Sequence, residues 1–193
     1  DGSIRYGMAA VKGIGKPVME AIVEERERGG LFSSLKDFCQ RLSGKEVNKR
    51  TIENFIKAGA FDSFGGTRKQ FMMIYVQVMD TVNQEKKSSM TGQMSLCDIM
   101  GEEDKKSFEI RLPDVGEYAK ESKLAFEKEV LGVYISGHPL EEYADVWKKN
   151  ITAATSDFYP MEESGLPKVR DGAKVIVGGM ITEKTIKYTK NNK

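Results

Sequence analysis

The sequence has very little of the residues that build metal and redox sites. Its 193 residues include one histidine and two cysteines, Cys39 and Cys97, whose spacing fits no zinc-ligand pattern. Hydrophobic residues make up 39% of the chain, yet no apolar run approaches the roughly 18 residues that a membrane-spanning helix needs. No signal-peptide pattern is visible. We therefore expect a cytoplasmic protein without metal, cofactor or membrane association.

Charge is unevenly distributed along the chain, although the formal net charge is only +1. Residues 1–87 carry a net charge of +4, residues 88–167 one of −8, and residues 168–193 one of +5. Basic ends around an acidic middle indicate two modules that face a polyanion and a connector that stays away from it. The plainer interpretation is that these charges form solvated faces, and we prefer it for the acidic middle.

The most informative motif places two glycines one residue apart, directly before a helix that begins near Pro17. Because glycine lacks a Cβ, an anion can approach the amides of Gly13 and Gly15 at the positive end of that helix. Flanking lysines add positive charge, and no group in the turn reads a base edge. The pattern is that of a helix-hairpin-helix, a sequence-independent clamp on the nucleic-acid backbone, although a tight turn without a ligand also fits it. The predicted backbone-binding residues are Lys12, Gly13, Ile14, Gly15 and Lys16.

Apolar periodicity and capping residues predict an all-helical module around this turn. The first helix should cover residues 17–28 and stop at Gly29 and Gly30. Phe61 and Phe64 are expected in the core rather than stacked on bases. Three further helices should follow, the last of them reaching about residue 87, with the caps Ser34, Asn48 and Thr67.

A second hairpin is predicted about 50 residues after the first, where one helix ends at Gly59 and another begins after Thr67. Basic side chains in the first turn of a helix oppose its dipole, so Arg68 and Lys69 suggest a nearby anion. Two hairpins would form a pseudo-symmetric pair, one for each strand of a duplex. The predicted backbone-binding residues here are Gly59, Ala60, Thr67, Arg68 and Lys69.

Residues 86–116 are charged and polar, which predicts a linker. One short apolar patch lies within it and has no core of its own. It either docks back onto the helical module or is a linear motif that inserts into a pocket of another protein, with its glutamine at the rim. Both interpretations fit this patch, which consists of Gln93, Met94, Ser95, Leu96 and Cys97.

Beyond the linker, the sequence predicts helices and then strands. One helix should start at Asp114 and Glu117 and run to about residue 134, and a shorter one should follow Pro139. His138 precedes that proline and is expected to be a turn residue rather than a catalyst. Residues 174–182 are β-branched and strand-like. Because the strands would have unpaired edges, we expect the chain to be a fragment of a longer polypeptide.

Several segments together resemble the bacterial replicative DNA polymerase III alpha subunit. They are residues 4–15, 58–62 and 127–140, and the last contains the specific element Leu-Gly-x-Tyr-x-Ser-Gly-His-Pro-Leu. The resemblance covers essentially the whole chain. It implies a tandem helix-hairpin-helix domain on duplex DNA behind the polymerase active site, a connector, and the first strands of an OB-fold. It also implies that residues 93–97 are an internal sliding-clamp motif, with Cys97 where the family prefers an aromatic residue.

The predicted fold is therefore mainly α. It comprises a tandem helix-hairpin-helix module (1–87), a linker with the clamp motif (88–116), a helical connector (117–167) and an incomplete OB-fold-like β segment (168–193). The predicted partners are duplex DNA, the sliding clamp and other replicase subunits. The predicted function is sequence-independent DNA binding and clamp tethering in support of processive DNA synthesis.

Two other functions are weighed against this one. In a helical protein-interaction module the hairpins would only pack helices, and DNA affinity would lack the steep salt dependence of phosphate contacts. A nuclease or lyase would need a nucleophile or a metal cluster, and we find neither. The resemblance places the polymerase carboxylates upstream of Asp1, so no catalytic residue is predicted in this chain.

Overall fold

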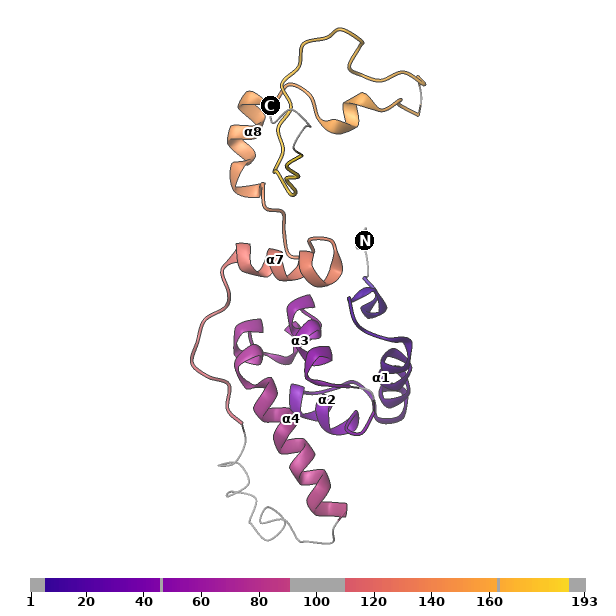
Figure 1. The fold of residues 1–193 in the computed structure, drawn as a ribbon, viewed down its shortest axis with the longest axis vertical. Coiled ribbons are helices and arrows are strands. Elements are labelled where there is room, and N and C mark those ends of the chain that lie inside the picture. The colour runs from indigo at the N-terminus through magenta and orange to yellow at the C-terminus, as the bar shows by residue number, and fades with distance from the viewer. Residues whose placement is uncertain (1–5, 46, 91–109, 163, 188–193) are drawn as a thin grey trace. The chain divides into compact units, whose positions relative to one another are not determined.

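Helices dominate the computed structural model of the chain, which describes residues 6–45, 47–90, 110–162 and 164–187 (Figure 1). Its α-helices are α1 (Lys16–Gly29), α2 (Leu35–Arg41), α3 (Lys49–Ala58), α4 (Arg68–Met90), α7 (Lys120–Leu131) and α8 (Ala144–Asn150). Its short 3-10 turns are η1 (Met8–Ala10), η2 (Asp62–Phe64), η3 (Glu141–Tyr143) and η4 (Thr155–Phe158). The prediction of a mainly helical protein is confirmed.

The starts of three helices confirm the predicted capping residues. The Ser34 hydroxyl and the Asn48 side chain each accept a hydrogen bond from the backbone three residues on, at 3.1 and 3.0 Å. At the start of α4, Thr67 Oγ1 accepts from the Gln70 amide at 3.2 Å, and Gln70 Oε1 accepts from the Thr67 amide at 2.9 Å. This reciprocal pair is a capping box. Each cap satisfies N–H groups that have no partner within their own helix.

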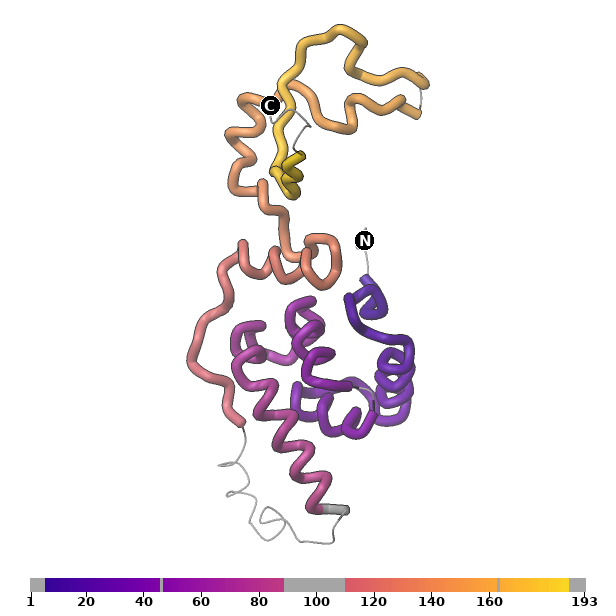
Figure 2. The backbone as a smooth tube through the Cα atoms, in the orientation of Figure 1, coloured from indigo at the N-terminus to yellow at the C-terminus, as the bar shows by residue number. Residues whose placement is uncertain are grey.

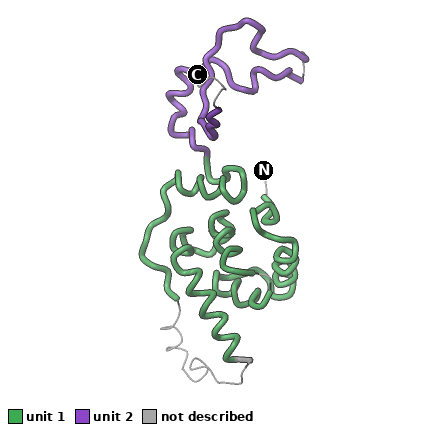
Figure 3. The backbone as a smooth tube through the Cα atoms, viewed as in Figure 1, with its two compact units in different colours: residues 1–137 green, residues 138–193 purple. Residues whose placement is uncertain are grey.

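The chain divides into two compact units, residues 1–137 and residues 138–193 (Figure 3). The first unit contains α1 to α4 and also α7, which packs against α3 (Figure 2). Val130 and Leu131 of α7 belong to the same hydrophobic core as the earlier helices. Residues 120–131, which the sequence assigns to the helical connector, thus pack against α3 within the first unit. The second unit contains α8 and the turns η3 and η4.

An aromatic cluster lies at the centre of the first unit. Phe38 of α2, Phe55 of α3 and Phe61 are each at most 3% exposed, and their rings meet edge to face at centroid distances of 5.1 to 6.1 Å. Burial of such a side chain contributes about 1.5–3 kcal/mol, so the cluster holds α2, α3 and the second hairpin together. The core position predicted for Phe61 is confirmed, and the half-buried Phe64 stacks on it at 5.3 Å.

The bounds of α7 differ from the predicted ones at both ends. The helix begins at Lys120, and the Glu117 side chain, expected in its first turn, instead accepts hydrogen bonds from the start of α4. It ends at Leu131 because Gly132 adopts a left-handed conformation with φ 75°. The extension to residue 134 is therefore wrong. His138 lies in a turn as predicted, where its Nδ1 accepts a hydrogen bond from the Leu140 amide at 3.1 Å.

The described part of the predicted β segment, residues 168–187, contains no strand. Ile176 makes two hydrogen bonds with Thr152, one from the Thr152 amide at 2.9 Å and one to the Thr152 hydroxyl at 2.8 Å. An extended segment becomes a strand only when a partner provides a ladder of backbone hydrogen bonds. These contacts do not form such a ladder, so the OB-fold part of the predicted fold is not confirmed.

Candidate nucleic-acid interface

The first hairpin, which joins η1 to α1, presents backbone N–H groups at the surface. Gly13 adopts a left-handed conformation with φ 78°, and Gly15, with φ −81°, is the N-terminal cap of α1. Both glycines and the flanking Lys12 and Lys16 are exposed. Among the residues that the structure describes, the amides of Gly13, Gly15 and Lys16 donate to no protein acceptor. The dipole of α1 adds positive potential, so the geometry of this turn suits an oxyanion such as a phosphate.

Several other backbone groups of the hairpin are bound within the protein. The Ile14 amide donates to the Val11 carbonyl at 3.2 Å, and the Lys12 amide donates to the Val130 carbonyl at 2.7 Å. The Lys12 carbonyl accepts a hydrogen bond from the Asn54 side chain at 2.8 Å. Lys12 therefore offers an anion its side chain rather than its amide. No sequence pattern indicated Asn54 or Val130 as hydrogen-bond partners of the hairpin. Asn54 already lies 42 residues from Lys12 along the chain, beyond the reach of a local motif.

The second hairpin uses its glycine turn to end α3. Gly59 adopts a left-handed conformation with φ 79° and donates its amide to Ile56 at 3.0 Å. The Ala60 amide donates to the Phe55 carbonyl at 2.9 Å, which completes a Schellman-type helix end. Both amides are thus engaged and are not available to a phosphate in this conformation. In the structure Gly59 and Ala60 thus end α3, and the backbone binding predicted for them stays a prediction.

Arg68 is buried instead of facing a polyanion. It is 5% exposed, and its guanidinium donates to Asp62 of η2 and to Glu127 of α7 at 2.8 to 3.2 Å. Glu127 is fully buried and also accepts from the amides of Ile135 and Ser136, at 2.7 and 2.9 Å. Burial alone raises the pKa of Glu127, but these amides and Arg68 outweigh it and hold the pKa below its ordinary value. Arg68 therefore forms an internal ion pair between the second hairpin and α7, and its predicted phosphate contact stays a prediction.

A carboxylate of the protein itself occupies the start of α4. Glu117 accepts hydrogen bonds from the amides of Arg68 and Lys69, both at 3.2 Å, and from the Tyr118 amide at 2.7 Å. Burial raises the pKa of Glu117, but the three amides lower it below its ordinary value. The anion that the basic residues suggested is thus an internal one. The Thr67 hydroxyl is also engaged, because it caps α4. Of the residues predicted to bind the backbone at the second hairpin, this leaves the Lys69 side chain to contact a phosphate.

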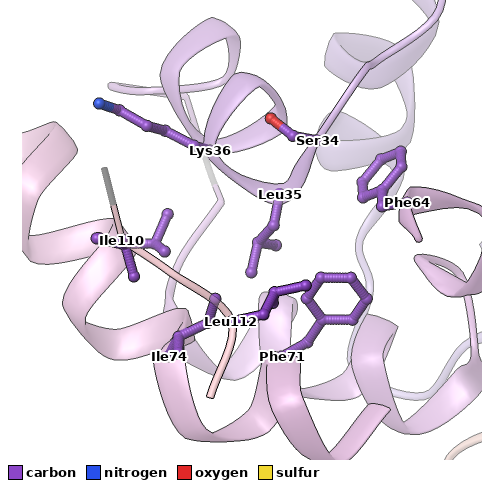
Figure 4. Close-up of a pocket in the computed structure, with 9 residues that line it drawn as sticks. Ser34, Leu35, Lys36, Phe64, Phe71, Ile74, Ile110 and Leu112 are labelled. Carbon is purple, nitrogen blue, oxygen red and sulfur yellow. The ribbon is translucent and has the colours of Figure 1, made fainter. Parts of the chain in front are cut away.

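An apolar cavity of about 260 Å³ lies between α2, α4 and the segment that follows the linker (Figure 4). Figure 4 shows Leu35, Phe71 and Leu112 at its walls, with the Lys36 ammonium directed away from it. Ile110 lines the same cavity and packs against the core. The Ser34 hydroxyl in its lining already caps α2. The cavity therefore offers apolar contacts and little to a charged ligand.

The predicted clamp motif, residues 93–97, lies outside the described residues. Within the described ranges, no helix is both long and apolar enough to cross a bilayer. In the same part of the chain, no three His, Cys, Asp or Glu side chains lie close enough together to hold a metal ion.

Residues 1–71 match the family of the helix-hairpin-helix motif. This match contains the first hairpin, the aromatic core residues of α2 and α3, and the start of α4. Residues 1–71 are therefore of the helix-hairpin-helix class, in agreement with the predicted helix-hairpin-helix module.

Curated relatives identify the family more closely. The chain is 36% identical over 143 residues to the DNA polymerase III subunit alpha of Borreliella burgdorferi, 34% over 193 residues to that of Mycobacterium leprae, and 34% over 186 residues to that of Vibrio cholerae. These alignments cover 74%, 97% and 96% of this chain. The chain belongs to the DNA polymerase III alpha subunit family. It spans 12% to 15% of the length of these relatives.

Proposed function

We propose that this chain binds duplex DNA through the phosphate backbone, without reading the base sequence, as part of a DNA polymerase III alpha subunit. Membership of that family and the helix-hairpin-helix match support the proposal. In the whole protein, this contact would support processive DNA synthesis together with the sliding clamp and other replicase subunits.

The exposed amides of the first hairpin carry the proposal. Three N–H groups, those of Gly13, Gly15 and Lys16, lie at the positive end of α1 with two lysine side chains beside them. The Lys16 side chain is 87% exposed and contacts Glu20 at 3.3 Å. Exposed pairs of this kind contribute roughly 0.3–0.5 kcal/mol, so a phosphate can take over the ammonium at small cost. Backbone amides and lysines recognise phosphate and not bases.

The proposed DNA contact uses one hairpin rather than two. At the second hairpin, the amides of Gly59 and Ala60 end α3, and Glu117 occupies the start of α4. We therefore propose a packing role for the second hairpin and a phosphate contact for the first. We expect the helical module to contact the DNA backbone through the first hairpin and not through the second.

The direct test is to replace Gly15 by valine. Its φ of −81° is open to any residue, and a Cβ there would meet Pro17 at an ordinary 3.5 Å, so the hairpin should keep its fold. The added side chain should block close approach of a phosphate. The matched control is Gly179→Val, at a glycine where an added Cβ would meet open space.

Binding is measured by fluorescence anisotropy with several duplexes of unrelated sequence. Gly15→Val should weaken binding to all of them alike, and Gly179→Val should leave it unchanged. A folded Gly15→Val protein that binds as tightly as the parent would contradict the proposed phosphate contact. A loss confined to one duplex would contradict its sequence independence.

We also propose that residues 93–97 bind the sliding clamp as an extended peptide. The support is the family resemblance and three apolar side chains placed within a charged linker. Changing Gln93 and Leu96 to alanine should abolish clamp binding and spare duplex affinity, whereas Thr91→Ala should affect neither. Cys97→Phe should strengthen clamp binding by about 1 kcal/mol or more, because phenylalanine buries more apolar area. A clamp titration that is insensitive to these changes would refute the motif.

The OB-fold assignment of residues 168–193 stays a prediction of the resemblance.

A further inference from the structure

The peptide that leads into the glycine turn is held from two sides by distant parts of the chain. Asn54, on α3, is 9% exposed and donates its side-chain amide to the Lys12 carbonyl at 2.8 Å. The Lys12 amide donates to the Val130 carbonyl at the end of α7, at 2.7 Å. Lys12 therefore has both of its backbone groups fixed inside the first unit, while its side chain is exposed.

The hydrogen bond to Asn54 determines where the next amide points. The Lys12 carbonyl and the Gly13 N–H belong to one trans peptide plane, in which the two groups point in opposite directions. When Asn54 holds the carbonyl toward the interior, the Gly13 N–H must face outward. The neighbouring Gly13 has φ 78°, and its ideal Cβ position lies 3.4 Å from Asn54 Nδ2. Glycine permits rotation of this peptide more readily than any other residue, so an external restraint is needed to fix it.

We propose that Asn54 is a positioning residue for the phosphate site of the first hairpin. Its side-chain amide prevents rotation of the peptide between Lys12 and Gly13 and so keeps the Gly13 N–H directed at the anion. This inference rests on the proposed function, because it assigns the restraint to the same site. Preorganisation of a binding group lowers the ordering cost of association, so loss of Asn54 should weaken phosphate binding without removing a direct contact.

A purely structural role for Asn54 predicts a different result. Thr51 provides the matched control, since it lies on the same helix, is 4% exposed and donates its hydroxyl to Asn48 at 3.3 Å. Thr51→Ala therefore removes a buried polar group of α3 that makes no hydrogen bond to the hairpin. If Asn54 only stabilised the fold, both variants would lower stability and neither would change the DNA affinity of the folded protein.

The experiment is a double-mutant cycle on duplex affinity between Asn54→Ala and Gly15→Val. Asn54→Ala alone should weaken binding by about 2- to 10-fold, the range that corresponds to one hydrogen bond. In the Gly15→Val background, where the phosphate is excluded, the same change should have an effect below about 2-fold. Thr51→Ala should stay below about 2-fold in both backgrounds. An equal loss in both backgrounds, or no loss from folded Asn54→Ala, would overturn the positioning role.

A second measurement does not depend on DNA or on the alanine variant. Asn54→Ser is a milder change whose hydroxyl is too short to reach the Lys12 carbonyl. In the NMR spectrum of the free protein it should shift the Gly13 amide resonance more than that of any residue at the second hairpin. An unchanged Gly13 resonance would refute the restraint. If the parent fails to bind duplex DNA while this shift is present, the proposed function fails and the restraint stands.

Discussion

Replacing Arg68 by leucine should destabilise the first unit severely. The change removes the guanidinium that contacts Glu127 at 2.9 Å, and Glu127 remains fully buried with its charge unpaired. Loss of one partner from a buried ion pair costs about 3–5 kcal/mol. Loss of the second ion pair of Arg68, with Asp62, adds little to this free-energy cost. The Asp62 side chain is 51% exposed, so water can hydrate it once the guanidinium is gone. The expected loss is comparable to much of the stability of an ordinary domain, about 5–15 kcal/mol.

Urea unfolding followed by helical circular dichroism measures this loss. For a urea m value of about 1–3 kcal/mol/M, the midpoint should fall by at least about 1 M. Arg50→Leu, at an exposed arginine on α3, should change stability by no more than about 0.5 kcal/mol. In a Glu127→Gln background, Arg68→Leu should cost less, because no charge is left unpaired. A loss below about 1 kcal/mol from Arg68→Leu alone would refute the assignment of Arg68 to a buried ion pair.

Two further predictions concern titrating groups. Because the pKa of Glu127 in the folded protein lies below its ordinary value of 4.5, its charged form stabilises the fold above that pH. The stability advantage of the parent over Glu127→Gln should therefore shrink as the pH falls through and below about 4.5. Urea midpoints of both proteins at a series of pH values measure this advantage. An advantage that grows on acidification would contradict the contacts of Glu127. Burial raises the pKa of Cys39 to about 12. In a Cys97→Ser variant at about pH 8, a thiol reagent should therefore label Cys39 only after denaturation. Rapid labelling of the native protein would contradict the burial of Cys39.

The features that the sequence predicted correctly are local ones. Ser34, Asn48 and Thr67 cap helices through groups three residues away, so each signal lies within a single turn of chain. Gly59 ends α3 because the turn requires a left-handed residue, which glycine adopts without strain. The core position of Phe61 follows from the size and apolar character of its ring. All of these depend on backbone conformation or hydrophobicity and not on distant partners.

The features that the sequence did not predict depend on contacts between distant segments. Two basic residues at the start of α4 suggested a nearby anion, and the Glu117 carboxylate lies there in the structure. No local pattern could tell a DNA phosphate from a protein carboxylate. Arg68 and Glu127 are 59 residues apart, and Glu117 lies 49 residues beyond the amide of Arg68 that it accepts from. The restraint of the hairpin by Asn54 belongs to the same class. Each of these pairings forms only when segments that are distant in the sequence pack together in the folded first unit.

The phosphate contact at the first hairpin can be measured through the salt dependence of duplex binding. The parent should lose affinity steeply with salt. Lys12→Ala with Lys16→Ala should flatten the slope of log K against log salt by about 1.8, or about 0.9 for each phosphate that a lysine no longer neutralises. The matched control, Lys36→Ala with Lys86→Ala, removes the same charge from α2 and from the C-terminal half of α4 and should leave the slope unchanged. Equal slopes for the parent and the Lys12 and Lys16 variant would contradict the phosphate contact at the first hairpin.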